Sequence, residues 1–140
     1  MNILFSVGIQ YKRKVLFPIN LIFRKRFRKT LKMTTMKILV AGDVEGNLPT
    51  LFKRVESVNA KAGPFEMLLC VGSFFGPGNL GWGDYKSGRC KVPLPVYILG
   101  PTHPSQLMAY PDLAGCELCE NVIYLGRQVG GRLIININKL

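Results

Sequence analysis

The chain has 140 residues, 48% of them hydrophobic, and a formal net charge of +11. This length suits one domain rather than two, and no apolar run approaches the ~18 residues that a membrane-spanning helix needs. The charge is uneven: residues 1–35 hold nine Lys or Arg and no acid, whereas residues 36–140 hold ten basic and eight acidic residues. The strong basicity therefore belongs to a leader, and the domain after it is nearly balanced.

The leader, residues 1–35, has three interpretations. Its Arg-rich, acid-free composition resembles a mitochondrial transit peptide, although Ser is sparse. Its clusters "KRK" and "RKRFRK" also fit a nuclear-localisation or RNA-contacting patch. Alternatively, Met36 is the natural start and the leader is translated upstream sequence, which a strand beginning at "MKILVAG" favours. We expect the leader to be disordered or non-native.

A βαβ unit opens the domain. Residues 37–41 form a short apolar run, as expected of a strand covered on both faces. Asn47 is a suitable N-cap for a helix with Pro49 in its first turn, and the Gly-Pro pair at 63–64 ends that helix. Residues 65–72 form a second strand, which should run parallel to the first after a right-handed crossover.

A long Gly- and Pro-rich loop follows at 73–94, and loops of that length in a compact domain are usually functional or mobile. We expect a third strand at 95–100, one helical turn within 101–112 and a fourth, shorter strand at 121–127, with a further strand candidate at 132–138. The sequence therefore predicts an α/β fold with a parallel sheet. Its functional edge should lie at the carboxyl ends of the strands.

The four cysteines are Cys70, Cys90, Cys116 and Cys119. The "CELC" pair has the spacing of a metal or redox site, but one pair cannot fill a tetrahedral zinc site, and His103 is the only histidine. The pair also precedes a strand instead of opening a helix. These features favour structural thiols in a reducing compartment.

Three loops follow the best-defined strands: "GDVEG" at 42–46, "GSFFG" at 72–76 and "GPTHP" at 100–104. Because the carboxyl ends of parallel strands meet at one edge, we expect the three loops to lie together. An Asp, a further polar residue and a His at such an edge suggest metal chemistry. For any single loop, a Gly-made turn with a solvated acid is the simpler explanation.

The order of these strands and loops resembles that of calcineurin-like metallophosphoesterases, which carry G-D-x-H, G-D-x-x-D and G-N-H-E or G-N-H-D. It is more closely similar to the amino-terminal, lariat-debranching-enzyme-like domain of the CwfJ family, the Cwf-nineteen-like splicing factors. The resemblance implies a partial calcineurin-like sandwich at residues 36–127, the amino-terminal part of such a domain, and a divergent tail at 128–140. It is carried by "GDVEGNLPTLFKRV", "KAGPFEMLLCVGSFFG", "YKSGRCKVPLPVYILG" and "GCELCENVIYLGR".

The loops depart from the enzyme pattern at most ligand positions. Asp43 stands where the first metal-ligating Asp would be, Glu45 replaces the His, and Ser73 stands at the place of the metal-bridging Asp. Residues 101–102 replace the Asn ligand and the catalytic His, and His103 comes one position late. These departures predict a vestigial site without catalytic residues.

Electrostatics explains why the departures matter. Two dications ~4 Å apart repel by roughly 16 kcal/mol at an effective dielectric of about 20, and a bridging carboxylate is a principal offset. The neutral hydroxyl of Ser73 cannot take over that role, and Glu45 removes a nitrogen that suits zinc, iron or manganese. We expect no cofactor, although weak binding of one Mg²⁺ or Ca²⁺ between Asp43 and Glu45 stays open.

The resemblance implies a catalytically inactive metallophosphoesterase-like binding domain of a nuclear pre-mRNA splicing factor. The expected partners are late spliceosome and intron-lariat complexes, intron-lariat RNA, and the RNA lariat debranching enzyme, whose activity the protein would modulate; no membrane is expected. Two alternatives stay open: an active metal-dependent phosphodiesterase with altered ligands, and an α/β protein sent to mitochondria by the leader.

The long loop offers a surface for RNA or a partner, because aromatic rings stack on single-stranded bases and cations contact phosphates. Phe74 and Phe75 are expected instead to pack the loop onto the sheet. The candidate binding residues are Trp82, Tyr85, Lys86, Arg89 and Lys91.

Overall fold

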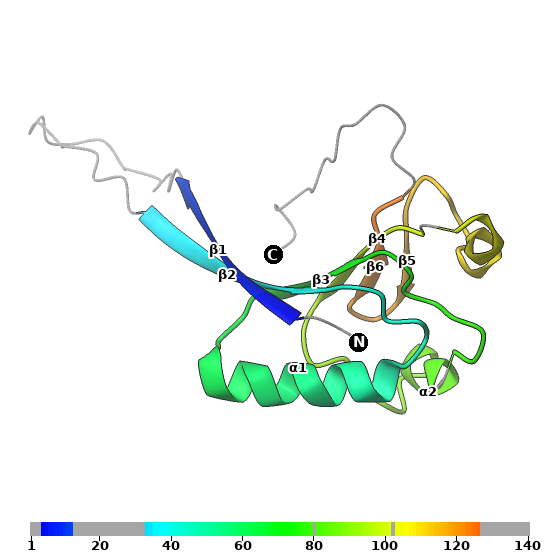
Figure 1. The fold of residues 1–140 in the computed structure, drawn as a ribbon, viewed down its shortest axis with the longest axis horizontal. Helices are drawn as coiled ribbons and strands as arrows, with labels where there is room; N and C mark the ends of the chain where they lie inside the picture. Colours follow the sequence, from blue (N-terminus) through cyan, green and yellow to red (C-terminus); the bar gives the residue numbers. More distant parts are fainter. Residues whose placement is uncertain (1–3, 13–32, 80, 102, 127–140) are drawn as a thin grey trace, which may run out of the picture.

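The computed structural model describes residues 4–12, 33–79, 81–101 and 103–126. Five strands, β2 to β6, form a mostly parallel sheet, β1 adds antiparallel to its edge, and the strand order is β1-β2-β3-β4-β6-β5 (Figure 1). The elements are β1 (Leu4–Lys12), β2 (Met33–Ala41), α1 (Leu48–Ala62), β3 (Met67–Val71), α2 (Trp82–Lys86), β4 (Val96–Leu99), the 3-10 helix η1 (Pro104–Ala109), β5 (Cys116–Cys119) and β6 (Val122–Tyr124).

The predicted βαβ start and parallel sheet are confirmed. β2 pairs in parallel with β3, β3 with β4, and β4 with β6, so the strands that carry the three glycine loops all end at the same edge. α1 begins after Asn47, as expected, although the Asn47 side chain makes no capping hydrogen bond, and it ends at the predicted Gly-Pro pair. A second sheet, which a calcineurin-like sandwich requires, is not among the described residues, so the sandwich stays a prediction.

One face of the sheet forms the main core with α1 (Figure 1). Alternation along the strands turns every second side chain toward the helix. The buried helix residues are Leu48, Leu51, Phe52 and Val55, and the fully buried strand residues opposite them include Leu39, Leu68, Val96, Ile98 and Val122. This packing fixes the loops at the strand ends, because each loop leaves an immobilised strand.

The opposite face of the sheet is less covered than the sequence predicted. Met36, Ile38 and Met67 are buried there, but Val40, Leu69 and Tyr97 are only partly buried. Val71 is 41% exposed. The expectation that the first strand is covered on both faces is therefore only half right for the described residues.

The leader contributes a strand that the sequence analysis did not identify. β1 pairs antiparallel with β2, from Leu4 opposite Ala41 to Lys12 opposite Met33. β2 accordingly begins at Met33 rather than at residue 37, and its early part extends with β1 past the rest of the sheet in Figure 1. Residues 1–3 and 13–32 lie outside the described residues, and the three interpretations of the leader remain predictions.

Two further elements differ from the expectation. "CELC" does not merely precede a strand: it is β5, which pairs antiparallel with β6 and has a register irregularity between Glu117 and Cys119. The long loop contains the short helix α2, whereas η1 confirms the predicted helical turn. The strand candidate at 132–138 lies outside the described residues. No described helix has the length and apolar character needed to cross a membrane.

Candidate strand-end site

The loops after β2, β3 and β4 meet through backbone hydrogen bonds. The N–H of Ser73 donates to Oδ1 of Asp43 at 2.8 Å. In return, the N–H groups of Val44 and Glu45 donate to the carbonyl oxygen of Ser73 at 2.8 and 2.9 Å. The N–H of Gly72 donates to the carbonyl of Leu99 in β4 at 3.0 Å. The prediction that these strand ends lie together is confirmed.

Gly72 is required at the centre of this arrangement. Its φ is +92°, and a Cβ built on it would lie 2.3 Å from Oδ1 of Asp43. The Asp43 carboxylate thus occupies the space that a side chain at position 72 would need. Position 72 therefore requires a glycine, because the Asp43 carboxylate packs against its backbone.

Glu45 lies in a turn whose backbone, rather than its side chain, contacts the next loop. Its φ is +52°, and its side chain is exposed. A Cβ at Gly76 would lie 2.2 Å from the Glu45 carbonyl oxygen, which shows how closely the two loops approach. The N–H of Gly76 donates to Oδ1 of Asn79 at 2.9 Å, so the side chain of Asn79 fixes the second loop.

His103 makes a local contact. It is exposed, it occupies the N-cap position of η1 without a side-chain capping hydrogen bond, and its Nδ1 lies 2.9 Å from Oγ of Ser105. Thr102 is outside the described residues. The side chain that links this third loop to the second is Gln106, whose Nε2 donates to the carbonyl of Phe75 at 3.0 Å. Sequence reasoning missed Gln106 and Asn79, because neither belongs to a metal-ligand motif.

The donor set at this edge does not fit a two-metal centre. Within the described ranges, no three His, Cys, Asp or Glu side chains are grouped so that they could hold a metal ion. Oδ1 of Asp43 accepts a backbone N–H, and position 73 offers no carboxylate to bridge two ions. A single ion between Asp43 and Glu45 remains a prediction.

A cavity of about 540 Å³ adjoins the site at the amino-terminal end of α1. Glu45, Asn47 and Thr50 line it from the first loop and the start of the helix, with Arg54 one turn further along. Asn79 closes it from the second loop. The cavity therefore lies beside the turn that contains Glu45.

The aromatic residues of the 73–92 loop anchor it to the core. Phe74 and Phe75 are 1% and 3% exposed, which confirms the predicted packing role. The ring of Trp82 lies 5.1 Å from that of Phe75, and the ring of Tyr85 lies 4.8 Å from that of Phe52, in edge-to-face geometry. Burial, followed by nearby negative charge, raises the pKa of Tyr85.

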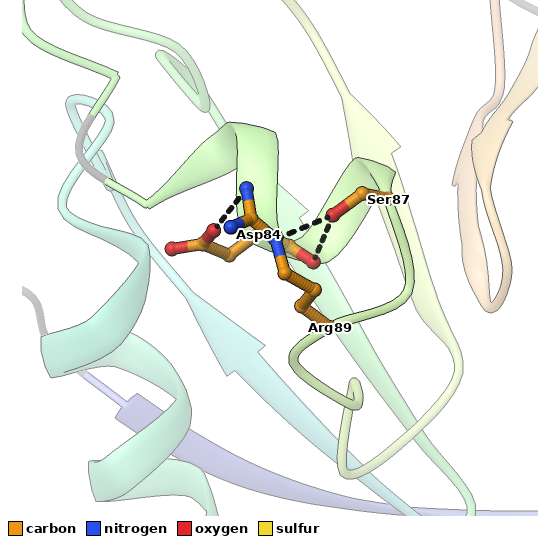
Figure 2. A network of polar contacts seen from close by, with 3 residues as sticks. All are labelled: Asp84, Ser87 and Arg89. Atoms are coloured by element: carbon orange, nitrogen blue, oxygen red, sulfur yellow. Dashed lines mark hydrogen bonds and ion pairs between the residues drawn. The ribbon is translucent and has the colours of Figure 1, made fainter.

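The cations of the same loop face solvent. Lys86, Arg89 and Lys91 are exposed. Nη2 of Arg89 forms an ion pair with Oδ1 of Asp84 at 2.9 Å, and Figure 2 shows Ser87 beside this pair, with its hydroxyl bonded to Nε of Arg89 and to the backbone carbonyl of Asp84. The five candidate binding residues thus divide into two anchored rings and three exposed cations on one segment.

Comparisons with known proteins connect this chain with one group of relatives. No protein-family model matches it. CWF19-like protein 1 of Homo sapiens is 44% identical over 94 residues, which cover 66% of this chain and 18% of that protein. The CWF19-like protein 1 homolog of Drosophila melanogaster is 49% identical over 94 residues, covering 66% and 17%. Zinc finger CCCH domain-containing protein 59 of Oryza sativa subsp. japonica is 43% identical over 109 residues, covering 66% and 18%. The chain thus spans less than a fifth of these relatives.

Proposed function

We propose, on the premise of the CWF19-like family that these relatives support, that this domain is a catalytically inactive, metallophosphoesterase-like binding module of a splicing-related factor. The single observation that carries the inactive assignment is the contact between Asp43 and Ser73. Where a hydrolase would place a bridging carboxylate, this chain has a serine whose backbone N–H bonds to Asp43.

The contact has a structural role at this edge of the sheet. Oδ1 of Asp43 accepts the Ser73 N–H, and the Ser73 carbonyl accepts two N–H groups from the Asp43 loop. These bonds fasten β2 to β3 at their ends and need no metal. The arrangement supports a rigid surface for binding rather than a centre for hydrolysis.

The partners are proposed from the family resemblance. They are late spliceosome and intron-lariat complexes in the nucleus, together with the RNA lariat debranching enzyme, which the protein would modulate. Because the chain spans less than a fifth of its relatives, these roles belong to the proposal for the whole protein. The described domain would supply one of its binding surfaces.

The α2 segment, which we define as α2 together with the residues up to Lys91 (82–91), is the part of this surface that we assign to RNA. Lys86, Arg89 and Lys91 are exposed cations that suit phosphates, whereas Trp82 and Tyr85 hold the segment against the core. Recognition would then depend mainly on charge, with less base stacking than the sequence pattern suggested.

Affinity purification of the tagged full chain from nuclear extract tests this function. Splicing factors and the debranching enzyme should be recovered with the wild-type chain in ribonuclease-treated and untreated samples. A variant with Lys86→Glu and Lys91→Glu should lose only the RNA-dependent part of that recovery. If no splicing component is recovered with a chain whose folding has been verified, the proposal fails.

A further inference from the structure

We propose that Ser87 is a phosphorylation site for a serine kinase of the protein kinase C class. The added phosphate would then form an ion pair with the Arg89 guanidinium and replace Asp84 as its partner. This inference goes beyond the proposed function and does not depend on it. It rests on the exposure of the α2 segment, the charges that flank Ser87, and the hydrogen bonds of its hydroxyl.

Ser87 is accessible to an enzyme. It follows α2 as the C-cap residue, and residues 86–91 are all exposed. α2 has only five residues, none of them buried. The hydrogen bonds of residues 87–90 are made to nearby residues of the same segment, so local opening there can bring Ser87 into a kinase cleft while Trp82 and Tyr85 stay packed on the core.

The flanking charges match a kinase with an acidic substrate groove. Lys86 precedes the serine, Arg89 follows two positions later, and Lys91 follows four positions later. Kinases distinguish substrates by such charge patterns. Basic residues on both sides of the serine match kinases that select basic substrates, and we take protein kinase C as the representative of that class.

The guanidinium of Arg89 already contacts both the hydroxyl of Ser87 and the carboxylate of Asp84, the two groups between which it would have to choose after phosphorylation (Figure 2). Oγ of Ser87 donates to the carbonyl oxygen of Asp84 at 3.2 Å and accepts from Nε of Arg89 at 3.2 Å. Nη2 of Arg89 contacts Oδ1 of Asp84 at 2.9 Å. The Asp84 carbonyl also accepts the N–H of Cys90 at 3.1 Å, so it keeps a partner when the hydroxyl is lost.

A phosphate on Ser87 would bind the Arg89 guanidinium more strongly than the Asp84 carboxylate does. It adds a charge of about −1.5 to −2 and three acceptor oxygens, and guanidinium groups pair with phosphate in bidentate geometry. It would also repel the Asp84 carboxylate. Because the Arg89–Asp84 pair is exposed, with side chains 74% and 46% accessible, little is lost when it breaks.

The chemistry is an ordinary phosphoryl transfer from ATP. Oγ of Ser87 forms a bond to the γ-phosphorus while the bond to the β–γ bridging oxygen breaks, ADP leaves, and the hydroxyl proton passes to the kinase's base. No group of this chain acts as a catalyst. The three cations Lys86, Arg89 and Lys91, opposed locally by Asp84, would be largely neutralised by the product.

Phosphate mapping tests the site. The full chain is incubated with the catalytic fragment of protein kinase C and Mg·ATP, and phosphopeptides are located by mass spectrometry. We expect phosphate on Ser87, its loss in Ser87→Ala, and slower incorporation in Arg89→Gln but not in the matched Lys53→Gln. If Ser87 stays unmodified while the kinase phosphorylates a standard peptide, the site is refuted.

A ³¹P NMR titration of the phosphorylated chain tests whether Arg89 pairs with the phosphate instead of Asp84. The second pKa of the phosphate should lie below that in an isolated phosphopeptide of residues 83–94, and Arg89→Gln should raise it. Asp84→Asn should lower it. The other nearby charged groups are the same in wild type and in both variants: Lys86 and Lys91 on this segment, Glu117 on the neighbouring β5 and Glu120 in the turn after β5. Equal pKa values in wild type and Arg89→Gln would show that Arg89 stays with Asp84.

Discussion

Oδ1 of Asp43 lies 2.8 Å from the backbone nitrogen of Ser73, and this contact joins the ends of the first two parallel strands. The Asp43 carboxylate thus serves as a hydrogen-bond acceptor for the neighbouring loop. The consequences of this contact for stability and for metal binding can be measured separately.

Removing the acceptor should destabilise the domain. Asp43→Ala deletes Oδ1 and should lower the free energy of unfolding by about 1–2 kcal/mol, because hydrogen bonds to charged groups are worth more than neutral ones. Asp43→Asn keeps an acceptor oxygen at that position and should lose less. Urea unfolding of the three chains measures the difference, and equal stability of Asp43→Ala and wild type would show that the contact has no structural weight.

Gly72 should tolerate no side chain. Gly72→Ala places a methyl group 2.3 Å from Oδ1 of Asp43 at a φ of +92°, so we expect a loss of roughly 1–3 kcal/mol. The matched control is Gly83→Ala in α2, where a Cβ meets nothing within 4 Å. That control should leave stability unchanged or raise it by up to about 1 kcal/mol. Similar losses in both variants would contradict the proposed packing of Asp43.

Charge reversal on the α2 segment should weaken RNA binding. The variant Lys86→Glu/Lys91→Glu leaves the Arg89–Asp84 pair in place and should reduce the salt dependence of binding to a single-stranded RNA by about 0.7 per lost phosphate contact. The control Lys53→Glu/Lys61→Glu makes the same charge change on exposed positions of α1. Equal effects of the two variants would mean that RNA binding depends only on the net charge of the chain and not on the α2 segment.

The cysteines should differ in reactivity. Burial raises the pKa of Cys70 from its ordinary value of 9.0 to about 12, whereas Cys90 is exposed. A maleimide at neutral pH should label Cys90 in the folded chain and Cys70 only after unfolding, because the thiolate is the nucleophile. Rapid labelling of Cys70 under native conditions would contradict its place in the core.

The same shift gives a pH dependence. The pKa of Cys70 is higher in the folded chain than in the unfolded chain. Burial of the neutral thiol therefore contributes fully to the free energy of unfolding below pH 9, and this contribution is lost as pH rises toward 12. Urea unfolding between pH 8 and 11 should show a steeper loss of stability in wild type than in Cys70→Ala. Parallel curves would argue against the burial of this thiol.

The sequence predicted the elements whose residues form long periodic patterns. The apolar positions of α1 and the short apolar strands after it were identified because burial imposes a spacing that is visible in one segment. The meeting of the glycine loops followed from strand direction alone. The packing of Phe74 and Phe75 was likewise predicted and found.

Other features depend on contacts between distant segments. β1 was missed because a strand in a basic leader becomes evident only through its pairing with β2. α2 has five residues, too few for a periodic signal, and the "CELC" strand forms because β6 lies beside it. The roles of Gln106 and Asn79 arise from hydrogen bonds across loops, which sequence spacing does not indicate.

Anomalous diffraction from crystals of the chain soaked in manganese tests the inactive assignment most directly. Because Ser73 offers no carboxylate to bridge two ions, we expect no pair of ordered Mn²⁺ ions beside Asp43, and at most one weakly occupied site toward Glu45. Two fully occupied manganese peaks near 4 Å apart, ligated by Asp43, would contradict it and restore a hydrolase.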